Sequence, residues 1–306
     1  MSKPSRNNAT EVPGAKSRYD DFLAVHINQT LSIHGTANFL SWHRFFTWTY
    51  EQALRTECGY TGHQPYWNWG KWALDPLKSP IFDGGAASMG GNGEFQAHNC
   101  TNGLPTGLNC IPPGDGGGCI ASGPFKNMTV NMGPISPTLA EPEIVPVPEF
   151  YTYNPRCVKR DISSWVSSRW TTEQNTTDLI VQNTNIARFQ TVMQGDFANG
   201  EYGVHTGGHF TIGGDPGGDL FASPGDPAFF LHHAQIDRTW WIWQNQEPDE
   251  RTDAIAGTIT INNEPPSRNG TLEDLIDLGV NADPITIGAV MSTTGLAGGP
   301  LCYIYV

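Results

Sequence analysis

The chain has few basic residues and no long apolar run. Its 306 residues contain 17 Lys and Arg against 30 Asp and Glu, so the formal net charge is −13. Nucleic acids and anionic membranes bind basic surfaces, so this charge argues against both as partners. The chain contains no run of about 18 apolar residues, the length that a helix needs to cross a bilayer. The opening MSKPSRNNATEVPG also lacks the apolar core of a signal peptide.

Cysteine is scarce as well, with six in the chain. An even number is compatible with disulfides in an oxidising compartment, although some could be free and the sequence does not give the pairing. The cysteines are Cys58, Cys100, Cys110, Cys119, Cys157 and Cys302.

The chain also contains six glycosylation sequons, at Asn8, Asn28, Asn99, Asn127, Asn175 and Asn269. We therefore expect a secreted glycoprotein, with Asn28 discounted as a glycan site because it falls in a predicted helix.

Regular secondary structure is poorly supported over residues 83–148. Twelve glycines fall between Gly84 and Gly123, and a proline-rich stretch ending PEIVPVPEF follows them. Such a segment predicts a long loop that is held by disulfides and packing. No linker divides the rest of the chain, which is long enough to bury one sizeable core.

Helical patterns flank this loop. Helices are expected over 17–57 with a break at His34-Gly35, over 178–197, and over about 227–244 after the start signal Asp226-Pro227. In the second of these, Ile186, Phe189 and Met193 share one stripe. The sequence therefore predicts a mainly α protein with little β structure, built as a four-helix bundle with a metal site in its core.

Histidine is the chemically informative residue. Seven of the nine histidines fall in two groups. The first is His26, His34 and His43, and the second is His205, His209, His232 and His233. Imidazole suits copper, zinc and iron. Two triplets without cysteine or clustered carboxylates indicate a pair of copper ions, whereas His63 and His98, in Gly- and Pro-rich surroundings, are interpreted as ordinary histidines.

The spacing of these histidines agrees with helix geometry. His205 and His209 are four residues apart, so they share one helix face. His26 and His34 are eight apart, which is about 12 Å of straight helix and too far for one ion. His34 should therefore follow the break, and His43 should bind from the first turn of the next helix.

The spacings HisX7HisX8His, HisX3His and DPxFxLHHxxxDRxW resemble the copper signatures of the tyrosinase, catechol oxidase and hemocyanin family. The segments RYDDFLAVH, FLSWHR, HFTIGGDPGGD and DPAFFLHHAQIDRTWWIWQ resemble those of short secreted fungal polyphenol oxidases, and the resemblance spans nearly the whole chain. It implies copper A on His26, His34 and His43, and copper B on His205, His209 and His233, with His232 as a neighbour.

The resemblance also implies one catalytic domain over 1–306. The chain would start inside the usual N-terminal region of the family, and Tyr303-Ile304-Tyr305 resembles the element that closes the domain. Longer members continue into a plug over the active site, so we expect an unblocked form here. Ser32 stands where many fungal tyrosinases have a cysteine bonded to a ligand ring, so no thioether is expected.

Further roles follow from the same resemblance. Thr206 follows the first copper B histidine, where strong monophenolases often have Asn, and either Glu201 or Gln194 would be the upstream partner that holds a water. Leu220 would gate the copper A side, Phe210 would shape the entrance, and Phe229 would pack against the metals. Asp237 would orient a ligand N–H or pair with Arg44 or Arg238.

These observations predict an oxidase that uses O2 to convert catechols to o-quinones, with weak or lagging hydroxylation of monophenols. One alternative is a tyrosinase with efficient monophenolase activity, and another is an oxygen carrier like hemocyanin. A zinc hydrolase would need bridging carboxylates that the ligand set does not offer. Small phenols are the expected partners, and no obligate protein partner is inferred.

Overall fold

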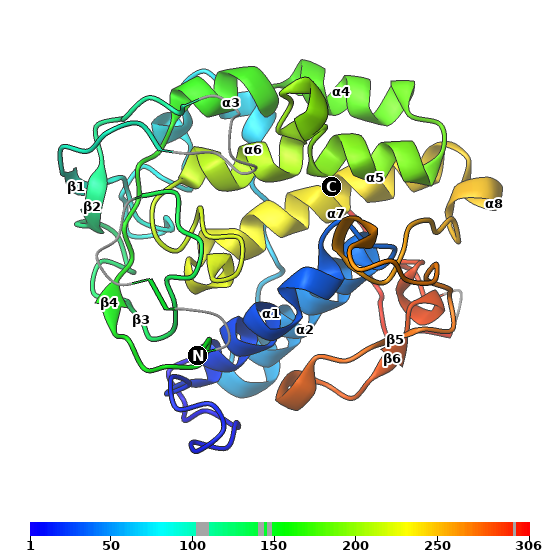
Figure 1. Ribbon diagram of the computed structural model, residues 1–306, viewed down its shortest axis with the longest axis horizontal. Helices are drawn as coiled ribbons and strands as arrows, with labels where there is room; N and C mark the ends of the chain where they lie inside the picture. The colour runs from blue at the N-terminus through cyan, green and yellow to red at the C-terminus, as the bar shows by residue number, and fades with distance from the viewer. Residues whose placement is uncertain (102–109, 140–143, 146–148, 296–297) are drawn as a thin grey trace.

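The computed structural model describes residues 1–306 apart from 102–109, 140–143, 146–148 and 296–297, and it is mainly helical (Figure 1). The helices are α1 (Arg18–Ile33), α2 (Phe39–Cys58), α3 (Ser164–Trp170), α4 (Glu173–Gln182), α5 (Ile186–Gln194), α6 (Gly203–Ile212), α7 (Ala228–Gln246) and α8 (Pro248–Arg251). Within the described residues, none is both long and apolar enough to span a membrane.

The described strands form three small antiparallel pairs. They are β1 (Gly93–Phe95) with β2 (Gly117–Ile120), β3 (Thr129–Val130) with β4 (Arg156–Cys157), and β5 (Leu275–Ile276) with β6 (Ile285–Thr286). The pairs lie at the edges of the helical body (Figure 1). The predicted class, mainly α with little β, is confirmed.

Four helices carry the clustered histidines: α1, α2, α6 and α7. Helix α1 begins at a capping box, in which Ser17 and Asp20 satisfy each other's backbone N–H groups. It ends where His34 is extended and Gly35 turns with φ +60°, so the expected break is confirmed. Helices α1 and α2 lie side by side, and α7 runs between this pair and α6 (Figure 1). The predicted bundle around the histidines is therefore confirmed.

Two boundaries differ from the prediction. The expected helix over 178–197 is wrong as a continuous element, because α4 ends at Gln182 and the Asn185 carboxamide caps the start of α5. The stripe on α5 is nevertheless buried as predicted. Helix α2 begins at Phe39, four residues before His43, so His43 lies in its second turn rather than its first.

The long loop over 83–148 contains three of the six described strands, and each described disulfide has at least one cysteine in it. Cys100 is bonded to Cys110, and Cys119 is bonded to Cys157, which confirms that disulfides hold this region. The part over 102–109 lies outside the described residues. Cys58 and Cys302 are exposed and pair with no cysteine of the described chain.

The core between α1, α2 and α7 is aromatic. The Tyr50 and Phe230 rings stack with centroids 3.6 Å apart, and the Phe46 ring stacks on Phe230 at 5.6 Å. Phe22 from α1 meets the same cluster edge-on. Rigid rings with few rotamers fix the spacing of the helices, so the histidines on them are held in place before any metal binds.

Candidate metal centre

The first histidine cluster joins α1, its C-terminal turn and α2. The ligand atoms of His26, His34 and His43 lie within 4.8 Å of one another, and all three residues are buried. Their ring centroids are 5.0 to 5.7 Å apart. Three imidazoles at this separation can converge on one metal ion.

Backbone carbonyls orient these rings. The Nδ1 atoms of His26, His34 and His43 lie 2.8, 2.9 and 2.7 Å from the carbonyl oxygens of Phe221, Thr30 and Phe39. A carbonyl only accepts, so each Nδ1 carries the proton and each Nε2 keeps its lone pair. Nε2 of His26 and of His43 is buried without a hydrogen-bond partner in the described chain. An unpartnered buried acceptor is costly, so the cluster fits a metal ion.

The second cluster joins α6 and α7. The ligand atoms of His205, His209, His232 and His233 also lie within 4.8 Å of one another. The Nε2 atoms of His209 and His233 are 3.2 Å apart, and the Gly217 carbonyl lies 3.3 Å from Nδ1 of His209. The cluster therefore contains one imidazole more than the predicted triplet.

The fourth imidazole, His232, has no ring contact with the first cluster among the described residues. Its Nε2 donates to the His205 carbonyl at 3.0 Å, and its ring packs on Trp69 and against Gly208. A Cβ at Gly208 would lie 2.1 Å from this ring, which explains the glycine. The His233 ring instead stacks on His43 with centroids 4.4 Å apart.

The two clusters form one centre. Besides the His43–His233 stack, the ring centroids of His34 and His205 are 5.9 Å apart. The Phe229 ring lies 4.1 Å from that of His233 and 5.4 Å from that of His26, so it packs against both clusters. Two ions held by these clusters would be neighbours.

Burial keeps all seven imidazoles neutral. Desolvation lowers the pKa of His34 to about 4 and that of His209 to about 3. The pKa values of the other five are also lowered, mainly by burial and then by neighbouring histidines. Only the neutral ring can bind a metal, so the site is ready to do so at neutral pH.

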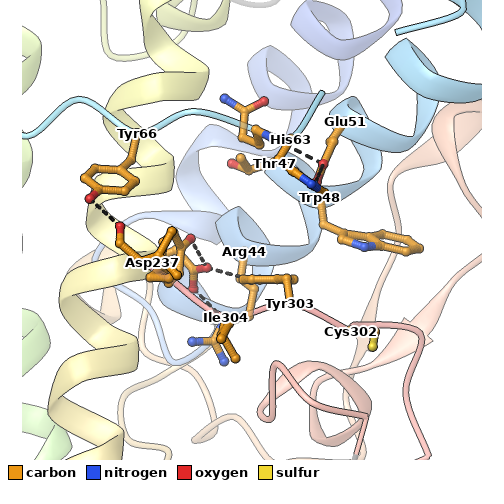
Figure 2. Close-up of a pocket in the computed structure, with 13 residues that line it drawn as sticks. Arg44, Thr47, Trp48, Glu51, His63, Tyr66, Asp237, Cys302, Tyr303 and Ile304 are labelled. Atoms are coloured by element: carbon orange, nitrogen blue, oxygen red, sulfur yellow. Dashed lines mark hydrogen bonds and ion pairs between the residues drawn. The ribbon is translucent and has the colours of Figure 1, made fainter. Parts of the chain in front are cut away.

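Beside the histidines, a buried ion pair ties α2 to α7. Nε of Arg44, next to His43, donates to Asp237 at 2.5 Å, and Tyr303 and Tyr305 donate to the same carboxylate at 2.6 and 2.5 Å. Figure 2 shows Arg44, Asp237 and Tyr303 meeting where the C-terminal segment crosses the two helices. Of the partners expected for Asp237, the structure shows Arg44; the carboxylate bonds to no histidine in the described chain.

A cavity of about 640 Å³ gives access to the centre. It reaches three histidines, one from the first cluster and two from the second: His34, His205 and His209. Among the predicted residues, Gln194, Thr206, Phe210 and Leu220 line it. Glu201 does not, because it is exposed and accepts a hydrogen bond from Trp170 at 3.0 Å.

Thr206 and Gln194 contact each other in this cavity. The Thr206 hydroxyl donates to the backbone carbonyl of Gln194 at 2.6 Å. The Gln194 side chain accepts from Gly35 N–H at 2.7 Å and donates to Gln190. Both side chains therefore have internal partners.

Several site residues were missed from the sequence. Asp219 lines the cavity, but its carboxylate accepts four backbone N–H groups, from Ile135, Ser136, Phe221 and Ala222. The segment 257–263 forms another part of the wall. The glycine- and proline-rich run GGDPGGD is a signal that could have drawn attention to Asp219, whereas no motif marked 257–263.

Comparisons with known proteins agree with this geometry. Residues 16–246 match the family model "Common central domain of tyrosinase". The chain is 41% identical to "Tyrosinase P" of Aspergillus terreus over 99% of this chain and 84% of that protein. It is 38% identical to "N-acetyl-6-hydroxytryptophan oxidase ivoB" of Emericella nidulans, over 99% and 85%.

A solved structure of similar fold is that of a polyphenol oxidase from Thermothelomyces thermophila, determined as a point mutant. It has a TM-score of 0.93 and 46% identity, and the match covers all of this chain and 82% of that one. The family uses a dinuclear copper site, which the two histidine clusters fit. The chain belongs to the tyrosinase family and is a type-3 copper oxidoreductase of the polyphenol oxidase kind.

Proposed function

We propose that the protein oxidises o-diphenols to o-quinones with O2 and hydroxylates monophenols only slowly and after a lag. Two catechols each lose two electrons and two protons, and one O2 is reduced to two water molecules. The observation that carries the proposal is that Thr206 is bonded to the Gln194 carbonyl, beside the second histidine cluster.

In this proposal one copper is held by His26, His34 and His43, and the other by His205, His209 and His233. The choice of His233 over His232 rests on their contacts, because the His233 ring stacks on His43 of the first cluster, whereas Nε2 of His232 donates to the His205 carbonyl. When bound, the copper pair supplies O2 binding and two-electron redox capacity. The protein holds the imidazoles neutral and fixed.

Hydroxylation of a monophenol depends more on a base that removes the phenol proton than oxidation of a catechol does. A phenol has a pKa near 10, so deprotonating it near pH 7 costs roughly 4 kcal/mol without help. Thr206 has its hydroxyl engaged, and the Gln194 amide is engaged at both ends. Asp219, the carboxylate in the described lining, is saturated by backbone N–H groups. Catechol oxidation is therefore favoured.

The cavity distinguishes this proposal from an oxygen carrier. A volume of about 640 Å³ that reaches three histidines is large enough for a substituted phenol. A carrier must instead shield its metals from phenols. Two disulfides are consistent with an extracellular protein, and we propose that residues 1–306 act there as one catalytic domain on small phenols.

The test is oxygen uptake by the copper-loaded protein with catechol and with phenol at pH 7. We expect immediate uptake with catechol, and uptake with phenol that is at least about 100-fold slower, which corresponds to about 3 kcal/mol of barrier. A trace of catechol should shorten the phenol lag. Equal initial rates on the two would instead show a full tyrosinase, and no uptake with catechol would favour a carrier.

Thr206→Asn tests the residue that carries the proposal. In the variant, only the NH2 group of the Asn side chain could donate to the Gln194 carbonyl, as the Thr206 hydroxyl does. Its amide oxygen would then be free to accept a hydrogen bond from a water. The phenol-to-catechol rate ratio should rise. Thr191→Asn is the matched control, because Thr191 lines the same cavity on α5 and its hydroxyl also donates to a backbone carbonyl, that of Ala187. An equal rise in both variants would remove the role given to Thr206.

A further inference from the structure

The outer part of the cavity is built from two walls that do not belong to the histidine clusters. One wall is a single face of α5, with residues spaced three and four apart: Ala187, Gln190, Thr191 and Gln194. The other is the segment 257–263, which contributes Gly257, Thr258, Ile261, Asn262 and Asn263. A substituent on a phenol ring bound at the histidines would lie between these walls.

The segment 257–263 is fixed to the metal centre rather than loosely attached. Asn262 N–H donates to the carbonyl of Gly35, the residue after His34, at 3.1 Å, and Ala37 N–H donates to the Thr258 carbonyl at 2.9 Å. Nε2 of Gln190 on α5 donates to the Ala256 carbonyl at 2.6 Å. The position of this wall is therefore set by the same turn that places His34.

The backbone of this wall is strained where it reaches the cavity. Asn262 and Asn263 have φ values of 51° and 59°, in the left-handed region, and no other non-glycine residue of the described chain has positive φ. Such backbone strain clusters at functional sites. Oδ1 of Asn263 is used by Ser267 N–H at 2.9 Å. The Asn262 carboxamide, which is exposed in the cavity, has no hydrogen bond within the described chain.

The walls are polar, and their one described carboxylate has no free oxygen lone pair to offer a ligand. The described lining contains no Lys, Arg or Glu, and its Asp219 is saturated by backbone N–H groups. Neutral groups that remain open on these walls include the Asn262 carboxamide and Oε1 of the buried Gln190, which has no bond among the described residues. Together they offer a hydrogen-bond donor and an acceptor.

Resting on the proposed function, we propose that the cavity selects phenols with a neutral, amide-type side chain, which hydrogen-bonds to Asn262 and Gln190. A substrate amide matches the open donor and acceptor. An ammonium side chain would lose water without finding a free carboxylate oxygen, because those of Asp219 are occupied, and a carboxylate side chain would find no Lys or Arg in the described lining. Neutral substrates are thereby favoured over charged ones, even though the protein's net charge of −13 attracts cations from a distance.

The test compares kcat/KM by oxygen uptake for four catechols: N-acetyldopamine, dopamine, 3,4-dihydroxyphenylpropionic acid and 4-methylcatechol. About 0.5 M NaCl screens the long-range attraction of dopamine. N-acetyldopamine should exceed both charged catechols by about fivefold, the range expected of one or two neutral hydrogen bonds. Equilibrium binding of N-acetyldopamine and dopamine to the copper-free protein, followed by calorimetry, should show the same order without turnover.

Variants of Asn262 and Asn263 separate the effect of the Asn262 carboxamide from that of the backbone conformation. Asn262→Gly keeps the backbone conformation that glycine tolerates and removes the carboxamide, so the ratio of N-acetyldopamine to 4-methylcatechol should fall about fivefold. Asn262→Asp should shift selectivity toward dopamine. Asn263→Gly is the control with a similar φ, and Oδ1 of Asn263 already accepts from Ser267 N–H, so its ratio should stay near the wild-type value.

The outcomes separate this inference from the proposed function. No oxygen uptake with 4-methylcatechol would overturn the proposed function, and the calorimetric order would still decide the inference. Uptake with 4-methylcatechol but equal kcat/KM for the neutral and charged catechols would overturn the inference alone. Equal changes in Asn262→Gly and Asn263→Gly would also overturn it, because they would reflect the loop rather than the carboxamide.

Discussion

Removal of Asp237 should destabilise the protein more than removal of any exposed ion-pair partner. The side chains of Asp237 and Arg44 are 5% and 0% exposed, and Arg44 also stacks on Trp240 with its Cζ 3.7 Å from the ring centroid. In Asp237→Ala the guanidinium would be buried without a counter-charge, and the hydroxyls of Tyr303 and Tyr305 would lose their acceptor. Breaking one partner of a buried pair costs about 3–5 kcal/mol.

A loss of about 4 kcal/mol lowers the melting temperature by about 6 °C in a chain of 306 residues, because unfolding entropy is about 2 cal/mol/K per residue. Thermal melts of wild type and variant with copper removed measure this. Asp274→Ala is the control: its partner Arg268 is 58% exposed, and the melting temperature should stay nearly unchanged. If both variants melt within about 1 °C of wild type, the buried pair does not hold α2 and α7 together.

Three further predictions concern the histidines and cysteines. His233→Ala should lose one of two coppers by metal analysis whereas His232→Ala retains both, and the reverse result would exchange their roles. Metal-free protein should be most stable above pH 6.5 and lose stability as pH falls toward 4, because the unfolded chain binds protons first; His34, with a pKa of about 4, contributes about 3 kcal/mol of this loss. A urea midpoint that does not change between pH 7.5 and 4.5 would contradict it. Denaturing alkylation should label two cysteines before reduction and six after it, since four form disulfides and Ser32 excludes a thioether.

The metal centre was predictable because the spacing of its histidines along the chain depends on local helix geometry. An i, i+4 pair on one helix, a triplet split by a His-Gly break, and a helix start at Asp-Pro each depend on neighbouring residues alone. Helix boundaries were less predictable. A helix over 178–197 fitted the stripe of Ile186, Phe189 and Met193, but the Asn185 side chain competes for backbone N–H groups and restarts the helix there.

Glu201 and Gln194 were both candidates from the family resemblance, and the structure separates them. Glu201 lies four residues before His205, which on one helix would place both side chains on the same face. Helix α6 begins only at Gly203, with φ +63°, so Glu201 precedes it and turns toward Trp170 instead. Gln194, eleven residues from His205, reaches the cavity because α5 packs along α6. Glu201 is nearer to His205 in the sequence but lies outside the cavity lining, whereas Gln194 lies in it. The turn before α6 determines where the Glu201 side chain points.

The outer wall of the cavity could not be found from the sequence for a related reason. Residues 257–263 lie beyond the 16–246 region that matches the family model, and backbone hydrogen bonds join them to Gly35 and Ala37, next to His34. Those bonds use N–H and carbonyl groups that every residue has, so they leave no side-chain signature. The metal ligands are constrained by the packed helices, whereas Asn262 is constrained by one turn. If Asn262 selects the substrate as proposed, a change of its side chain alone should alter which phenol binds, because the hydrogen bond that ties it to the turn of His34 uses backbone atoms.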